Sequence, residues 1–388
     1  MAACCVAAAT AMPGEWSGYA AAEMRAFASK GAFSGQQRHY PALSLQPEYY
    51  LDFAGGDQRL TFTGFLRLDL YDGDRTHADL RELYWEKSAD SWEARVGVRK
   101  LFWGVTESQH LVDILNQTDL AERPDGEEKL GQPMVELCLI RAWGIVDLYL
   151  MPYFRERTFP GPAGRLRPPL EVDSDGATYA SEAEQFHLDL AARWSHTVGP
   201  FDIGLAHFRG TNRRPVLVWG QKDGGPAALT PHYEIVDQTS LDMQATTATT
   251  LWKLETIAHL GPTDDYLALA GGFEYTLWNL LTTGIDLGLL VECHYDQRGH
   301  TGPNPFQNDL FFGTRLALND MPSSELVAGL AVDLGSAARL YSVEASRRLY
   351  ASWRAALEIR AFTALEEEDP LHALRKDDYV QFRLARYF

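Results

Sequence analysis

Three residue types that hydrolases use for catalysis occur together between positions 187 and 195. In such enzymes a carboxylate orients a histidine, and the histidine activates a serine, so His187, Asp189 and Ser195 have the right chemistry. Their spacing does not separate them from ordinary polar residues of an alternating segment. The chain has no Gly-x-Ser-x-Gly, His-Glu-x-x-His, phosphate-binding glycine loop or dinucleotide fingerprint. We therefore predict that the protein is not an enzyme and uses no cofactor.

The four cysteines, Cys4, Cys5, Cys138 and Cys293, do not have the spacing of a zinc site or a disulfide framework. We predict no metal site, and we expect Cys138 and Cys293 to be small apolar residues of two strands.

A second kind of chemistry is electrostatic. The stretch 103–129 is rich in acidic residues, among them Asp113, Asp119 and Glu122, whereas alternating segments elsewhere carry basic residues. The basic candidates are Arg67, Arg95, Arg99 and Arg193. If this stretch folds into a water-filled lumen, the two sets would face each other and create a transverse field across a constriction. The alternative is a solvated loop above structural ion pairs of the wall.

The elements that would position these residues are segments with a two-residue apolar period. In 59–70, Leu60, Phe62 and Leu66 share one face, and Thr61 and Arg67 share the other. About eighteen such segments occur, and uncertain boundaries allow sixteen. They are 17–28, 42–53, 59–71, 76–88, 92–103, 132–142, 144–155, 184–196, 200–210, 232–246, 249–260, 265–277, 282–295, 308–319, 322–334, 338–349, 351–363 and 376–388.

The final segment favours a membrane over a soluble sandwich. Its apolar face consists of Val380, Phe382, Leu384 and the terminal Phe388. A transmembrane barrel closes with such a strand, and segments of roughly ten residues suit a tilted crossing of a bilayer. Aromatic residues near strand ends, such as Phe154, Trp252 and Trp353, would form an interfacial girdle. We predict an all-β, transmembrane, antiparallel up-and-down barrel of about 16–18 strands, with short periplasmic turns and long extracellular loops.

Connections alternate in length along the chain. Short, turn-forming sequences at 54–58, 196–200, 261–264 and 319–322 alternate with longer stretches such as 102–132, 155–183 and 209–231. In the first long stretch, Leu111, Ile114 and Leu115 have helical spacing, with Ser108 as a candidate cap. The basic, proline-rich stretch 155–169 either contacts an anionic solute or lipopolysaccharide phosphate, or packs as a rigid loop over the mouth.

Composition limits the remaining alternatives. The net charge of -18 argues against nucleic-acid binding, and a mean hydropathy of -0.24 with no run of eighteen apolar residues excludes helical spans. No long spacer divides the chain, so residues 12–388 are predicted to form one domain. Residues 1–11, which end in Ala9-Thr10-Ala11, resemble the remnant of a secretory signal peptide.

Over nearly its whole length the chain resembles bacterial outer-membrane porin-like β-barrels of an uncharacterised proteobacterial branch. The closing strand and the blocks Leu101-Phe-Trp-Gly104 and 153–160 carry the resemblance. One departure is Arg386 at the third position from the end, where the family often has an aromatic. The resemblance implies the outer membrane of a Gram-negative bacterium, contact with its lipid and lipopolysaccharide, recognition by the barrel assembly machinery, and the homo-trimer common in such barrels.

Two functional hypotheses follow. The first is a channel for passive diffusion of small hydrophilic or charged solutes, narrowed by the loop after the fifth strand. The second is a sealed barrel that acts as a surface-binding, adhesive or scaffold protein through its loops.

Overall fold

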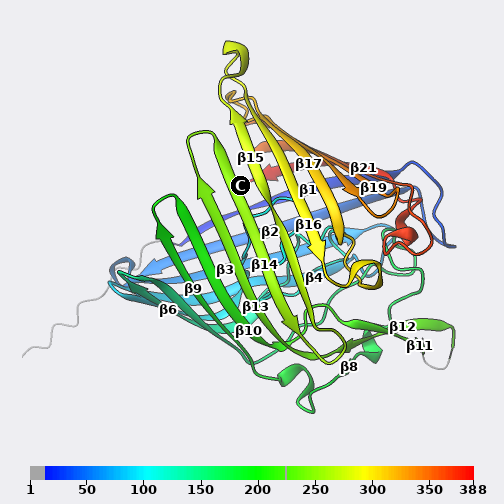
Figure 1. Cartoon of the computed structure of the whole chain (residues 1–388), viewed down its shortest axis with the longest axis horizontal. Helices are drawn as coiled ribbons and strands as arrows, with labels where there is room; N and C mark the ends of the chain where they lie inside the picture. The colour runs from blue at the N-terminus through cyan, green and yellow to red at the C-terminus, as the bar shows by residue number, and fades with distance from the viewer. Residues whose placement is uncertain (1–13, 223–224) are drawn as a thin grey trace, which may run out of the picture.

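The strands form a ring in which the first pairs with the last (Figure 1). The computed structural model describes residues 14–222 and 225–388. Its main sheet has 18 strands, every neighbouring pair of which is antiparallel. The strands are β1 (Glu15–Phe27), β2 (His39–Phe53), β3 (Gln58–Asp69), β4 (His77–Ala89), β5 (Trp92–Arg99), β6 (Gln132–Arg141), β7 (Gly144–Met151), β9 (Asp189–Val198), β10 (Phe201–Thr211), β13 (Ile235–Thr246), β14 (Thr250–Leu260), β15 (Tyr266–Leu277), β16 (Asp286–Asp296), β17 (Asn308–Ala317), β18 (Glu325–Asp333), β19 (Arg339–Tyr350), β20 (Trp353–Thr363) and β21 (Tyr379–Tyr387).

The structure confirms the predicted closed barrel, and each predicted segment overlaps one of these strands. A second sheet was not predicted. It consists of β8 (Thr178–Tyr179), β11 (Val216–Gln221) and β12 (Ala227–Tyr233). The hairpin of β11 and β12 projects beyond one end of the barrel in Figure 1.

The two faces of the barrel differ as the alternation predicts. Apolar side chains such as Leu66 and Leu205 are exposed on the outside, whereas Glu255 and Glu292, which alternate with apolar neighbours, are buried on the inside. An apolar exterior with a polar interior is the pattern of transmembrane barrels, because the ring satisfies every ladder hydrogen bond while lipid contacts the apolar face. The fold therefore places the chain in a bacterial outer membrane.

The closing strand lies as the sequence predicts. Strand β21 pairs with β20 on one side and with β1 on the other, where Leu384 lies opposite Ala22 and Phe382 opposite Met24. Val380, Phe382 and Phe388 are exposed on the outer face. Recognition of this strand by the assembly machinery stays a prediction.

The connections named from the sequence lie at the predicted ends of the barrel, with one exception. The turns at 54–57, 90–91, 142–143, 199–200 and 351–352 lie at one end of the barrel, and the connections 100–131 and 152–188 lie at the other. The short turn 261–264, which we grouped with the former, lies at the long-loop end because it joins β14 to β15. The length of a turn alone therefore does not predict at which end of the barrel the turn lies.

Two further predictions concern the interfacial aromatic girdle and the N-terminal signal remnant. Phe154, expected in the interfacial girdle, is fully buried and packs edge-on against Tyr233 inside the structure. The predicted signal remnant at 1–11 lies outside the described residues. Among the residues that are described, no helix is long and apolar enough to cross a membrane.

The outward orientation of Leu357 in β20 gives a direct test of the lipid-facing side. Leu357→Arg should lower the free energy of unfolding in lipid vesicles by roughly 2–4 kcal/mol if this position lies near the bilayer midplane. Urea titration followed by tryptophan fluorescence measures the change. Ser342→Arg, on the opposite face of neighbouring β19, is the control, and an equal loss in both variants would contradict the assigned faces.

Candidate functional site

Residues 100–131, here called the lumen loop, fold into the barrel instead of remaining above it. Val112, Leu115, Asn116 and Asp119 are at most 1% exposed although they belong to a connection between strands. Of the two positions considered for the loop after the fifth strand, the structure shows the one inside the barrel, where its residues can obstruct the lumen.

An apolar cluster holds one side of the lumen loop against the wall. Leu111, Val112, Ile114 and Leu115 pack with Trp103 and with inward-facing side chains of seven consecutive strands, β6 to β15. The wall members of this cluster are Met134, Tyr149, Met151, Ala191, Ala206, Phe208, Val236, Ile257, Tyr266, Ala268 and Ala270. Burying each large aliphatic chain stabilises the folded loop by roughly 1.5–3 kcal/mol. This part of the lumen is therefore filled.

Two wall carboxylates fix the backbone of the lumen loop. Glu255 accepts hydrogen bonds from the backbone N–H groups of Val105 (2.7 Å), Thr106 (3.0 Å) and Val112 (3.2 Å). Glu292 accepts hydrogen bonds from the N–H groups of Glu107 (2.7 Å) and Ser108 (3.0 Å). The predicted short helix is absent from 104–117, because these N–H groups bind the wall and Ser108 binds Glu292 instead of capping a helix.

Sequence reasoning did not find Glu255 and Glu292. In a strand alternation they look like any other inward-facing carboxylates. Only their complete burial, at 0% and 1% exposure, identifies them as anchors. A buried carboxylate is costly unless several donors satisfy it, so the lumen loop and these two residues depend on each other.

The predicted acidic residues of the lumen loop are each paired with a nearby cation. Asp113 lies 3.2 Å from Lys129, Asp119 lies 3.0 Å from Arg81, and Glu122 lies 2.8 Å from Arg67. Of the predicted opposing pairs, the structure brings together Arg67 and Glu122.

The other predicted arginines pair with carboxylates of the wall itself. Arg95 and Arg99 share Glu136, and Arg95 also binds Glu86. Arg193 reaches across β10 to make two hydrogen bonds with Asp242, at 2.6 and 2.8 Å. That path requires Gly204, because a Cβ there would lie 2.1 Å from the Arg193 guanidinium. Most of the charged residues that we expected to face each other across the lumen therefore form direct ion pairs with nearby residues instead.

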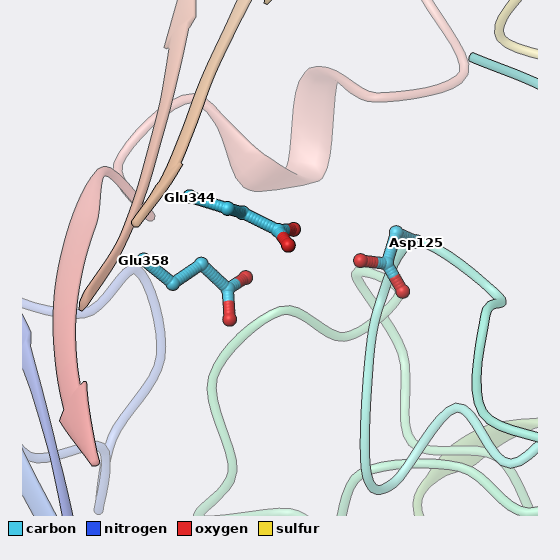
Figure 2. Close-up of side chains that lie close together, drawn as sticks. All are labelled: Asp125, Glu344 and Glu358. Carbon is cyan, nitrogen blue, oxygen red and sulfur yellow. The ribbon is translucent and has the colours of Figure 1, made fainter. Parts of the chain in front are cut away.

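The tip of the lumen loop meets the opposite wall. Figure 2 shows Asp125 of the loop facing Glu344 of β19 and Glu358 of β20. Arg123 and Arg360 lie among these carboxylates: Arg123 is 2.6 Å from Asp125 and 3.0 Å from Glu344, and Arg360 is 3.1 Å from Asp125. We call these five residues the tip cluster; it holds three acidic and two basic groups.

The two arginines of the tip cluster keep Asp125 in its charged form. Burial raises the pKa of Asp125, but the guanidiniums of Arg123 and Arg360 outweigh burial and hold this pKa at about 2. The carboxylate is therefore ionised at neutral pH. Oxygens of Asp125, Glu344 and Glu358 all lie within 4.8 Å of one another, as in a cation site, but the two arginines already neutralise much of their charge.

Residues 152–188, here called the mouth loop, cross the outer end of the barrel. Arg165 forms a buried ion pair of 2.6 Å with Asp377, and Leu166 packs against Phe27 and Tyr379. The basic stretch 155–169 thus packs over the mouth, as one of its two interpretations expected.

The hydrolase-like trio does not assemble. His187 Nδ1 lies 2.8 Å from Asp189, which is also bound by Arg213 at 2.6 Å. Within the part of the chain that the structure describes, Ser195 makes no side-chain hydrogen bond to either residue.

Comparison with known proteins shows that the chain is similar in fold to solved outer-membrane barrels. No protein-family model and no curated protein sequence matches the chain. Wzi, an outer-membrane protein of Escherichia coli, aligns with 97% of this chain and 84% of its own, at 9% identity and a TM-score of 0.54. A porin of Rh. blastica (97% and 100% covered, 9% identity, TM-score 0.48) and OprB of Pseudomonas putida (97% and 94%, 10%, 0.45) also align. The Wzi alignment supports the barrel fold.

Removing both anchors tests the attachment of the lumen loop. In Glu255→Ala/Glu292→Ala, backbone amides of residues 105–112 should exchange with deuterium at least tenfold faster, because hydrogen bonds to a charged acceptor contribute about 1.5–3 kcal/mol each. Hydrogen-exchange mass spectrometry of the protein in micelles measures this. Glu48→Ala is the control, because this lumen carboxylate accepts hydrogen bonds from wall residues. Unchanged exchange in the double variant would show that the apolar cluster suffices.

Proposed function

We propose that the protein is a passive channel for small hydrophilic solutes whose path runs beside the tip cluster. The observation that carries the proposal is the asymmetry of the lumen. Part of the wall from β6 to β15 is covered by the apolar cluster, whereas inward-facing charged side chains on β18 to β20 remain accessible. Glu325, Glu344 and Arg354 have side chains that are 54%, 46% and 45% exposed.

The predicted pore residues support the proposal indirectly, because their ion pairs fix the lumen loop and the wall in place. Asp119 and Glu122 tie the lumen loop to Arg81 and Arg67 of the wall, and Asp113 pairs with Lys129 within the loop. Arg95, Arg99 and Arg193 stiffen the wall. Selectivity then depends on the tip cluster and on the acidic wall beside it. The proposal contains no catalytic step.

A sealed barrel that works through its outer loops is the second candidate. The apolar cluster inside the lumen and the buried Arg165–Asp377 pair across the mouth favour it. Wzi is described as a carbohydrate-binding β-barrel involved in group 1 capsule assembly, so a capsule-type polysaccharide is the probe for this candidate.

Deleting residues 107–128 separates the two candidates. In a planar lipid bilayer the wild type should show ohmic conductance, and the deletion should raise it, because the loop that crosses the lumen is removed. A correctly inserted barrel without current, whose deletion variant loses polysaccharide binding and stays silent, would establish the sealed barrel instead.

Charge reversal at the tip cluster tests whether the solute path runs beside it. Glu344→Lys should shift the reversal potential under a salt gradient toward anion preference, because it exchanges a negative for a positive charge beside the proposed path. Glu182→Lys, the same change on the mouth loop, is the matched control. Equal shifts in both variants would place the path elsewhere.

A further inference from the structure

A cavity lies inside the barrel between the lumen loop and the short-turn ends of β7, β9, β10 and β13. Its volume is about 480 Å³, which is the size of a small-molecule site. Val105 lines it from the lumen loop, and the four strands form its walls. We call this cavity the turn-end pocket. Each strand contributes at least one lining residue, among them Ile145, Ser195, Asp202 and Gln244.

The apolar cluster separates the turn-end pocket from the outer mouth. On each of the four strands the pocket residues lie near the short turn, and a residue of the apolar cluster lies farther toward the outer mouth. These cluster residues are Tyr149 of β7, Ala191 of β9, Ala206 of β10 and Val236 of β13. A molecule therefore reaches the pocket from the short-turn end of the barrel. The pocket is distinct from the proposed solute path, which runs beside the tip cluster at β19 and β20.

Two uncharged polar side chains of the turn-end pocket have no protein partner. Ser195 lies directly opposite Ile145, and Gln244 lies directly opposite Asp202. Among residues 14–222 and 225–388, no group forms a hydrogen bond with the Ser195 hydroxyl or with the Gln244 side-chain amide. A hydroxyl and an amide can each donate and accept a hydrogen bond. A ligand that fits them must therefore offer both donors and acceptors.

The charges that line the turn-end pocket cancel one another. Arg193 makes two hydrogen bonds with Asp242, at 2.6 and 2.8 Å, and Asp202 accepts one from the Thr197 hydroxyl at 2.6 Å. Arg141 supplies the second positive charge of the lining. An ion that entered the pocket would lose part of its hydration without meeting an opposite net charge, which is unfavourable. The lining therefore favours an uncharged ligand.

We propose that the turn-end pocket binds a small uncharged polyhydroxy compound. The hydroxyl groups of such a compound donate and accept, as Ser195 and Gln244 require, and its C–H groups can pack against the aliphatic side chains of Val105 and Ile145. The Arg193 guanidinium is held over the ring of Trp103, so the lumen loop also supports the polar wall of the site. Binding does not depend on conduction, because the ligand enters and leaves at the short-turn end.

Saturation-transfer NMR of the full-length protein tests the site, with glucose and maltose as probes in separate arms. The protein is kept in an amine-oxide detergent, since a sugar-based detergent would compete for the pocket. We expect saturable binding of at least one probe. Ser195→Ala and Gln244→Ala should each raise the Kd about threefold or more, because each variant removes one hydrogen bond to the ligand. Ser44→Ala, on the inner face of β2 and outside the pocket, is the matched control.

Gluconate and glucosamine test the charge of the ligand, because they resemble glucose in size and carry a negative and a positive charge. Both should bind about threefold more weakly than glucose, or more weakly still. The proposal is overturned by the absence of saturable binding of glucose and maltose, by equal affinities for the neutral and charged probes, or by equal affinity in wild type and both alanine variants. Ser195 and Gln244 make no other side-chain hydrogen bond in the described ranges, so the two variants should fold. None of these outcomes depends on current through the barrel.

Discussion

Every backbone polar group that leaves water must find a hydrogen-bond partner, and this constraint governs both parts of the molecule. In the wall, the pairing of β21 with β1 removes the two free edges of the sheet. Inside the lumen no sheet is available, and side chains supply the partners. Glu255 and Glu292 bind the N–H groups of the lumen loop, and Asn116 binds the carbonyls of Arg99 and Leu130. An irregular segment can therefore lie deep inside a barrel.

These anchors decide where the lumen is narrow. The first part of the loop is held against β14 and β16, its middle is paired with Arg67 and Arg81 of β3 and β4, and its tip reaches β19 and β20. The loop thus contacts the wall on several sides. Apolar packing fills part of the region next to β6–β15, and accessible charged side chains are left around the tip cluster.

The arrangement of charges follows from the distance dependence of Coulomb attraction. A transverse field needs charges that stay apart, yet oppositely charged groups in a partly dry lumen gain more by direct contact than in water. Arg95, Arg99 and Arg193 each have a wall carboxylate within reach, and they bind it rather than facing the loop.

The sequence by itself determined the barrel and its strands, because a two-residue period fixes which face of a strand meets lipid and because a closed ring is the arrangement that satisfies such strands in a bilayer. It also named charged residues of the lumen, but of their predicted oppositions only Arg67 with Glu122 is present. Only the tertiary structure decided that Glu255 and Glu292 are anchors, that 104–117 is not helical, and that Asp125 meets Glu344. Contacts across a lumen join residues more than a hundred positions apart, and their geometry depends on the curvature of the whole barrel, which no local pattern encodes.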